Sequence, residues 1–97
     1  MSIIVTVEFP TQPGKTEDLK VALKGALPDT RTYDGCEKVI ATTDLDTPTT
    51  IILVEKWASR PQYETYLQWR MDTGLLDAIG PLLAGPPVIK YLEEFDA

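Results

Sequence analysis

Apolar residues recur along this chain with two different periods, which divide it into strands and helices. Positions 2–9 are rich in β-branched residues and predict a strand with both faces covered. Leucine and alanine then recur at helical spacing from Leu19 to Leu27, and Thr16 precedes them as a candidate helix cap. Pro28 is expected to disturb this helix, because proline has no amide hydrogen to donate. The first third of the chain therefore predicts a strand followed by a helix.

The middle of the chain predicts an antiparallel hairpin. An Asp-Gly turn leads into a strand over about 36–43, and a second strand covers 50–57. The connection between them is too short for a crossover, so the two strands should pair antiparallel. Asp44 and Asp46 in this connection could be imagined around a cation, but ordinary turn chemistry is the better interpretation.

The last third predicts a helix, a short second helix and a final strand. Ser59 and Gln62 have the spacing of a capping box, and a proline lies in the first turn, which predicts a helix over 60–72. Gly74 should interrupt it. Leucines and an isoleucine over 75–83 suggest a further short helix, and 88–95 predicts the last strand.

The order of elements is β-α-β-β-α-β, which is typical of an α+β ferredoxin-like fold with a four-stranded antiparallel sheet. The 97 residues are enough for a single domain, 1–97. The first and last strands are apolar on both faces, whereas helices can cover only one face of such a sheet. We therefore expect the other face to pair with a second copy of the chain, which makes a homodimer.

Charge and composition exclude several classes of function. The net charge is −6 and the isoelectric point is about 4.4, which argues against nucleic acid and against an anionic membrane surface as partners. No apolar run approaches the length of a membrane span. The first residues lack the pattern of a signal peptide, and the single cysteine cannot form an internal disulfide, so a cytoplasmic location is expected.

Five short motifs carry a resemblance, and they occur in order along nearly the whole chain. They are Pro13-Gly14-Lys15, Tyr33-Asp34-Gly35-Cys36, Asp46-Thr47-Pro48, Glu55-Lys56-Trp57-Ala58-Ser59 and Leu82-Leu83-Ala84-Gly85-Pro86-Pro87. Together they resemble the antibiotic biosynthesis monooxygenase family, and in particular its quinol-monooxygenase-like members of the dimeric α+β barrel superfamily. The resemblance implies a homodimer and a small apolar aromatic ligand. It also implies oxidation by dioxygen with neither metal nor flavin as cofactor.

The residue inventory agrees with a chemistry that needs no metal. The chain has no histidine, one cysteine and no carboxylate cluster at ligand spacing, so a zinc or transition-metal site is not expected. Its only glycine-rich segment, residues 80–85, lacks a phosphate-loop or dinucleotide-binding pattern.

Candidate site residues fall on one face of the strand over 50–57. Leu53, Glu55 and Trp57 alternate onto the same side of that strand. The resemblance implies that Trp57 lines a cavity between sheet and helices, and an ordinary core aromatic is an equally good interpretation. Glu55 could be a general base with a pKa raised by burial, or a carboxylate held in a structural pair.

A second group of candidates lies along the helix over 60–72. Tyr63, Tyr66, Leu67 and Arg70 fall on one stripe. Arg70 could pair with Glu55, bind the oxyanion of a phenolic ligand, or extend to solvent. Tyr66 can donate a hydrogen bond to a ligand oxygen.

Trp69 lies off this stripe, where it could line the mouth of a pocket or contact a partner subunit.

Two departures from the family pattern limit the functional prediction. The resemblance implies an asparagine where Leu53 stands and a histidine where Tyr66 stands, and the chain contains neither residue type. Haem degradation is therefore not expected. The predicted function is a cofactor-independent monooxygenase of a hydroquinone or phenolic substrate, with Glu55, Arg70 and Tyr66 catalytic and Trp57, Tyr63, Leu53 and Trp69 binding substrate. Non-catalytic ligand binding by a dimer, and isomerase or cyclase chemistry, stay open as alternatives.

Overall fold

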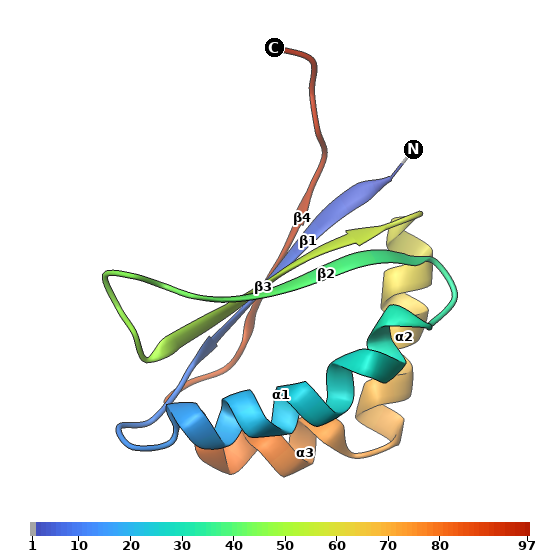
Figure 1. Cartoon of the computed structure of the whole chain (residues 1–97). Helices are drawn as coiled ribbons and strands as arrows, with labels where there is room; N and C mark the ends of the chain where they lie inside the picture. The colour runs from blue at the N-terminus through green and yellow to red at the C-terminus, as the bar shows by residue number, and fades with distance from the viewer. Residues whose placement is uncertain (1) are drawn as a thin grey trace.

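Strands and helices follow one another in the order that the sequence predicts. The computed structural model describes residues 2–97 (Figure 1). Its strands are β1 (Ile3–Pro10), β2 (Cys36–Thr43), β3 (Thr50–Trp57) and β4 (Val88–Leu92). Its helices are α1 (Thr16–Arg31), α2 (Arg60–Asp72) and α3 (Leu75–Ile79), and a 3-10 turn follows over Gly80–Leu82.

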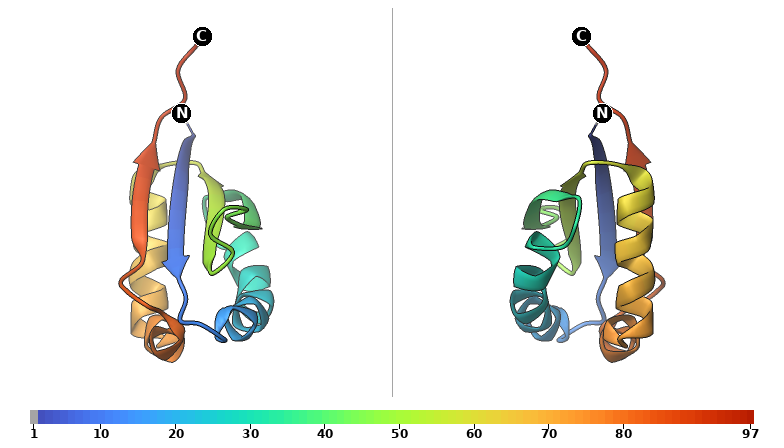
Figure 2. Two further views of the ribbon diagram at one scale, coloured as in Figure 1. Left: turned by 90° about the vertical axis from the view of Figure 1, so that its left-hand side faces the viewer. Right: turned by 90° about the vertical axis from the view of Figure 1, so that its right-hand side faces the viewer.

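The strands form one antiparallel sheet in the order β2-β3-β1-β4. The helices lie together on one side of this sheet, as the views in Figures 1 and 2 show. The predicted α+β ferredoxin-like fold is therefore confirmed. Within residues 2–97, no helix has the length and apolar character needed to cross a membrane.

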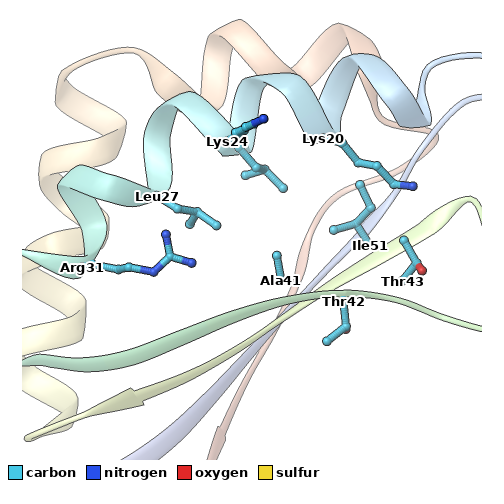
Figure 3. Close-up of a pocket in the computed structure, with 9 residues that line it drawn as sticks. Lys20, Lys24, Leu27, Arg31, Ala41, Thr42, Thr43 and Ile51 are labelled. Atoms are coloured by element: carbon cyan, nitrogen blue, oxygen red, sulfur yellow. The ribbon is translucent and has the colours of Figure 1, made fainter.

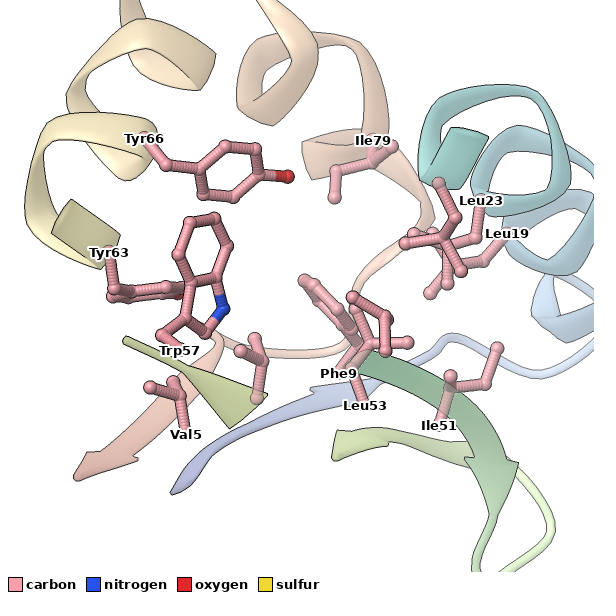
Figure 4. Close-up of a cluster of buried hydrophobic side chains, with 13 residues drawn as sticks. Val5, Phe9, Leu19, Leu23, Ile51, Leu53, Trp57, Tyr63, Tyr66 and Ile79 are labelled. Atoms are coloured by element: carbon pink, nitrogen blue, oxygen red, sulfur yellow. The ribbon is translucent and has the colours of Figure 1, made fainter. Parts of the chain in front are cut away.

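The hydrophobic core lies between the sheet and the helices (Figure 4). Alternate residues of β1 and β3 point into it, and the pattern of burial along β3 has a strict period of two. The opposite face of the sheet has no covering element among the described residues. Ile40, Val88 and Leu92 on that face are 42%, 45% and 44% exposed.

The start and end of α1 differ from the prediction. The helix continues through Pro28 to Arg31. The proline removes only the hydrogen bond that its amide would donate to the carbonyl of Lys24, and the buried side chains of Leu27 and Thr30 on either side of it hold the last turn against the core. Thr16 is not the cap: Lys15 occupies that position, and the Thr16 hydroxyl instead lies 2.6 Å from the hydroxyl of Thr11.

The boundaries of α2 agree with the prediction. The amide of Gln62 donates a hydrogen bond to Oγ of Ser59 over 3.3 Å, which confirms Ser59 as the N-cap. The final strand is shorter than predicted, since β4 ends at Leu92 and residues 93–97 continue beyond the sheet (Figure 1).

Candidate functional site

A small cavity lies between the sheet and the helices, with a volume of about 70 Å³. Most of its lining is aliphatic or aromatic and comes from β1, β3, β4 and all three helices. The polar side chains that line it are Thr30, Glu55, Tyr63, Tyr66 and Arg70. An apolar cavity with a few convergent polar groups is the usual form of a small-molecule site.

Glu55 is a buried carboxylate on an inner strand of the sheet. It lies on β3 and its side chain is held toward the helices by the alternation of the strand, so that the residue is only 3% exposed. Its Oε1 accepts a hydrogen bond from Nε1 of Trp57, two residues along the same strand, over 2.9 Å. The indole therefore fixes the position of the carboxylate.

The environment of Glu55 favours its protonated form more than water does. Burial raises the pKa of the Glu55 carboxyl above its ordinary value. The hydrogen bond from Trp57 and the positive charge of Arg70 lower the pKa and offset part of this rise. A carboxyl with a raised pKa is suited to accept and return a proton near neutral pH.

Glu55→Gln should therefore remove a pH-dependent loss of stability. The folded protein holds the Glu55 proton more tightly than the unfolded chain, so stability is greatest below the unfolded pKa and falls as pH rises through the folded pKa. Each unit of a pKa difference corresponds to about 1.4 kcal/mol. We expect the melting temperature of Glu55→Gln to exceed that of the wild type by a few degrees at pH 8, and to match it at pH 4. Thermal unfolding followed by circular dichroism between these pH values measures the difference, and Glu64→Gln on the exposed face of α2 is the control.

Arg70 is a buried cation that lies near the end of α2, and it is 7% exposed. Its Nε donates a hydrogen bond to the hydroxyl of Tyr66 over 2.9 Å. Its Nη2 donates to the carbonyl of Ala26 over 2.7 Å and to Oγ1 of Thr30 over 2.9 Å. Arg70 therefore ties α2 to α1 through neutral acceptors.

The structure contradicts two of the alternatives for Arg70, extension to solvent and pairing with Glu55. It does not extend to solvent, and among the ion pairs of residues 2–97 none joins it to Glu55. The reason is that Thr30 and Ala26, at the end of α1, supply nearer acceptors. The positive charge nevertheless acts on the Glu55 carboxyl through space.

Tyr66 remains protonated and hydrogen-bonded at the edge of the cavity. Its hydroxyl lies 2.7 Å from Oγ1 of Thr30. Burial raises the pKa of Tyr66, while its hydrogen bonds with Thr30 and Arg70 lower it in part. Burial also raises the pKa of Tyr63. Both phenols are therefore hydrogen-bond donors or acceptors at neutral pH, and neither is a base.

Trp57 packs inside an aromatic cluster instead of facing the cavity. The residue is 0% exposed, and its ring centroid lies 5.0 Å from that of Tyr66 and 5.4 Å from that of Tyr63 (Figure 4). Of the two interpretations of Trp57, this geometry agrees with the ordinary core aromatic, because Tyr63 and Tyr66 of α2 pack over the indole. Trp57 instead positions Glu55.

Trp69 also lies away from the cavity lining. Its ring centroid is 5.2 Å from that of Tyr33, and the guanidinium of Arg70 stacks 4.6 Å from its centroid. It covers the outer side of Arg70.

Five of the predicted site residues are brought together around the cavity. They are Leu53, Glu55, Tyr63, Tyr66 and Arg70. Thr30 joins them and was not predicted, although a signal exists: it falls on the same stripe of α1 as Leu23 and Leu27, where a polar residue is unexpected. No group of three histidine, cysteine, aspartate or glutamate side chains that could hold a metal occurs within residues 2–97.

Several solved structures have the same fold as this chain. Rv0793 from Mycobacterium tuberculosis is 22% identical with a TM-score of 0.85, over 100% of this chain and 98% of that one. A conserved protein from Methanosarcina mazei is 15% identical with a TM-score of 0.88, over 98% of this chain and 94% of that one. A further structure, named as an antibiotic biosynthesis monooxygenase, is 14% identical with a TM-score of 0.85, over 97% and 99% of the two chains.

Similarity in fold at these sequence identities does not assign the chain to a family, whereas a match to a family model does. A search of the curated proteins finds no match. The model of the antibiotic biosynthesis monooxygenase family matches residues 2–70, which include β1 to β3, α1 and the part of α2 up to Arg70. The chain therefore belongs to the antibiotic biosynthesis monooxygenase family.

Proposed function

We propose that this protein is a monooxygenase that oxidises a small hydroquinone or phenol in the cavity, without metal or flavin. The observation that carries the proposal is that a buried carboxylate and a buried guanidinium line the same apolar cavity, Glu55 on β3 and Arg70 on α2. Buried charges are costly, so two of them beside one small cavity need an explanation that an ordinary core does not require. A ligand with an ionisable hydroxyl supplies one.

The proposed reaction balances with the substrate as the only reductant. A hydroquinone and dioxygen give a hydroxyquinone and water: one oxygen atom is inserted into the ring, the other leaves as water, and the four electrons come from the substrate. Glu55 accepts the phenolic proton, and Arg70 and the Tyr66 hydroxyl stabilise the phenolate by charge and hydrogen bonding. The phenolate then reduces dioxygen more readily than the phenol does.

Binding of an aromatic ring requires the cavity to enlarge. Its volume of about 70 Å³ has room for about two water molecules, at about 30 Å³ each. The shortest helix of its wall is α3, which has five residues between Gly74 and Gly80 and contributes Leu75, Leu76 and Ile79 to the lining. We propose that α3 moves outward when substrate binds.

Oxygen consumption tests the proposed reaction. A panel of hydroquinones and phenols is incubated with the protein in an oxygen electrode, and at least one should be consumed above the rate without protein. For that substrate, Glu55→Gln should lower kcat by about 100-fold, because a positioned general base contributes about 10²–10⁴-fold.

The matched control for this test is Glu64→Gln, which alters an exposed glutamate of α2 and should leave kcat unchanged. No consumption above the uncatalysed rate with any substrate would contradict the proposal. Equal rates for wild type and Glu55→Gln would remove Glu55 from the mechanism.

The small volume of the cavity favours a second candidate function, that of a non-catalytic small-molecule-binding protein. This function predicts saturable binding of a phenol, seen as a change in tryptophan fluorescence, without oxygen uptake. The same titration and the oxygen electrode, applied to one ligand, separate the two functions.

We also propose that the protein acts as a homodimer through the open face of its sheet. Apolar side chains from all four strands gather there, on the face opposite the helices: Ile4, Ile40, Ile52, Val54, Val88 and Leu92. Apolar side chains gathered on an uncovered sheet face often mark an interface, and a second copy presents the same surface.

Val54→Glu should convert this dimer into a monomer. Val54 lies between Thr6 and Ile40 in the sheet, so a charge there would be buried in the centre of the interface. Sedimentation should give twice the chain mass of 10.8 kDa for the wild type and the chain mass for the variant. Val21→Glu, at a residue 71% exposed on α1, is the control and should stay dimeric. A monomeric wild type would contradict the proposal.

A further inference from the structure

A second and larger cleft lies between α1 and the edge strand β2, outside the cavity described above. Its volume is about 370 Å³, within the usual range for small-molecule sites. Leu23 and Leu27 line both spaces, so they form the wall between them. The cleft is therefore separate from the site of the proposed oxidation.

The cleft has a cationic lining in a protein that is acidic overall. Lys20, Lys24 and Arg31 lie along one stripe of α1, and no carboxylate is among the lining residues. The whole chain has nine basic residues and a net charge of −6, so three bases at one cleft are a local excess. Repeated like charges at helical spacing destabilise a helix slightly, which a bound anion would offset.

Two of these cations have no carboxylate partner in the part of the chain that the structure describes. Lys20 pairs with Glu17 over 3.1 Å, whereas no ion pair within residues 2–97 includes Lys24 or Arg31. Nη2 of Arg31 donates a weak hydrogen bond to the carbonyl of Val39 over 3.3 Å, which holds the guanidinium at the strand. The remaining donors of Arg31 are available to a ligand.

The free edge of β2 adds amide donors to the cleft. The amide of Asp44 donates to the carbonyl of Thr50 on β3, and donors alternate between the two sides of an antiparallel strand. The amides of Ala41 and Thr43 therefore point to the free edge of β2. The carbonyl of Val39, which Arg31 contacts, points to the same edge.

The middle of the cleft is apolar. Figure 3 shows Arg31 and Lys20 reaching from the two ends of α1 toward the strands, with Leu27, Ala41 and Ile51 between them. A bare inorganic anion would leave this apolar floor uncovered, and a neutral apolar molecule would leave the cations without partners. The lining suits a molecule that has both parts.

We propose that this cleft binds a small amphipathic carboxylate. The carboxylate lies at Arg31, with the unpaired Lys24 adding positive charge from the same helix, and the apolar body covers Leu27, Ala41 and Ile51. This second site is independent of the cavity at Glu55, so its presence or absence does not depend on whether the protein oxidises phenols.

Titration with sodium decanoate below its micelle concentration tests this site. We expect saturable binding by calorimetry, with chemical-shift changes centred on the amides of Ala41 and Thr43 in NMR spectra of the wild type. The double variant Lys24→Gln/Arg31→Gln should weaken decanoate binding at least about tenfold. Lys15→Gln removes an exposed lysine outside the lining and should leave the affinity unchanged.

Ligands of the same length separate charge from hydrophobicity. Decanol should bind the wild type at least about tenfold more weakly than decanoate does. The double variant should bind decanol and decanoate with equal affinity. Failure of decanoate to saturate the wild type would overturn the proposal, and so would occupation of the cleft by a second copy of the chain that blocks it. Equal affinity of the double variant, or shift changes centred elsewhere than Ala41 and Thr43, would overturn it as well.

Discussion

Replacing Trp57 with alanine lowers the free energy of unfolding by about 4 kcal/mol, the expected cost of truncating a fully buried tryptophan. The side chain is 0% exposed and packs against Tyr33, Tyr63 and Tyr66. Its removal also leaves the buried Glu55 carboxylate without the Nε1 donor. Since small domains have total stabilities of about 5–15 kcal/mol, the variant should be close to unfolded at 37 °C. Urea denaturation followed by far-UV circular dichroism measures the loss.

Two further variants separate packing from hydrogen bonding at Trp57. Trp57→Phe keeps most of the apolar volume and loses one ring of the indole together with the donor to Glu55, so we expect it to lose less than half as much stability. Trp69→Ala truncates a tryptophan that is only partly buried, and its cost should also be well below that of Trp57→Ala. Equal losses for Trp57→Ala and Trp69→Ala would contradict the buried position of Trp57.

Arg70→Met should lower the free energy of unfolding by about 3 kcal/mol, the second largest effect we expect. Methionine fills similar space but cannot donate to Tyr66, Thr30 or the carbonyl of Ala26. These buried acceptors would then have lost a charged donor, and each unsatisfied group costs about 1–3 kcal/mol before relaxation. The measurement is again urea denaturation, at pH 7.

Arg60→Met is the matched control for Arg70→Met on the same helix. Arg60 is exposed, pairs with Glu64 over 3.7 Å and stacks 3.8 Å from the ring centroid of Tyr91, so its loss should cost less than about 1 kcal/mol. A double-mutant cycle of Arg70→Met with Tyr66→Phe should show a coupling of about 1 kcal/mol. Additive effects in this cycle would mean that the Arg70–Tyr66 hydrogen bond contributes nothing.

Local patterns in the sequence predict the elements well because the relevant interactions are local. The cap of α2 needs only Ser59 and Gln62, three residues apart, and the structure contains that hydrogen bond. The alternation of Leu53, Glu55 and Trp57 likewise follows from the geometry of a single strand, and all three side chains point toward the helices.

The partners of the site residues could not be predicted, because they come from distant parts of the chain. Arg70 donates hydrogen bonds to Thr30 and Ala26, which are 40 and 44 residues away, and the sequence around Arg70 gives no sign of these partners. Burial of Trp57 behind Tyr63 and Tyr66 depends on how α2 packs across the sheet. The end of α1 differs from the prediction for another reason: Pro28 costs the helix one hydrogen bond, and burial of Leu27 and Thr30 on either side of it keeps the last turn helical.

The cavity has one wall that is rigid and one that is short and bounded by glycines. Glu55 stands on β3, which is hydrogen-bonded to a neighbouring strand on each side, whereas α3 has five residues between Gly74 and Gly80. For the proposed function, amino-acid replacements in this segment would change the size of molecule that fits while the carboxylate stays where it is. Natural diversification of such proteins, and redesign in the laboratory, would then begin at residues 75–79.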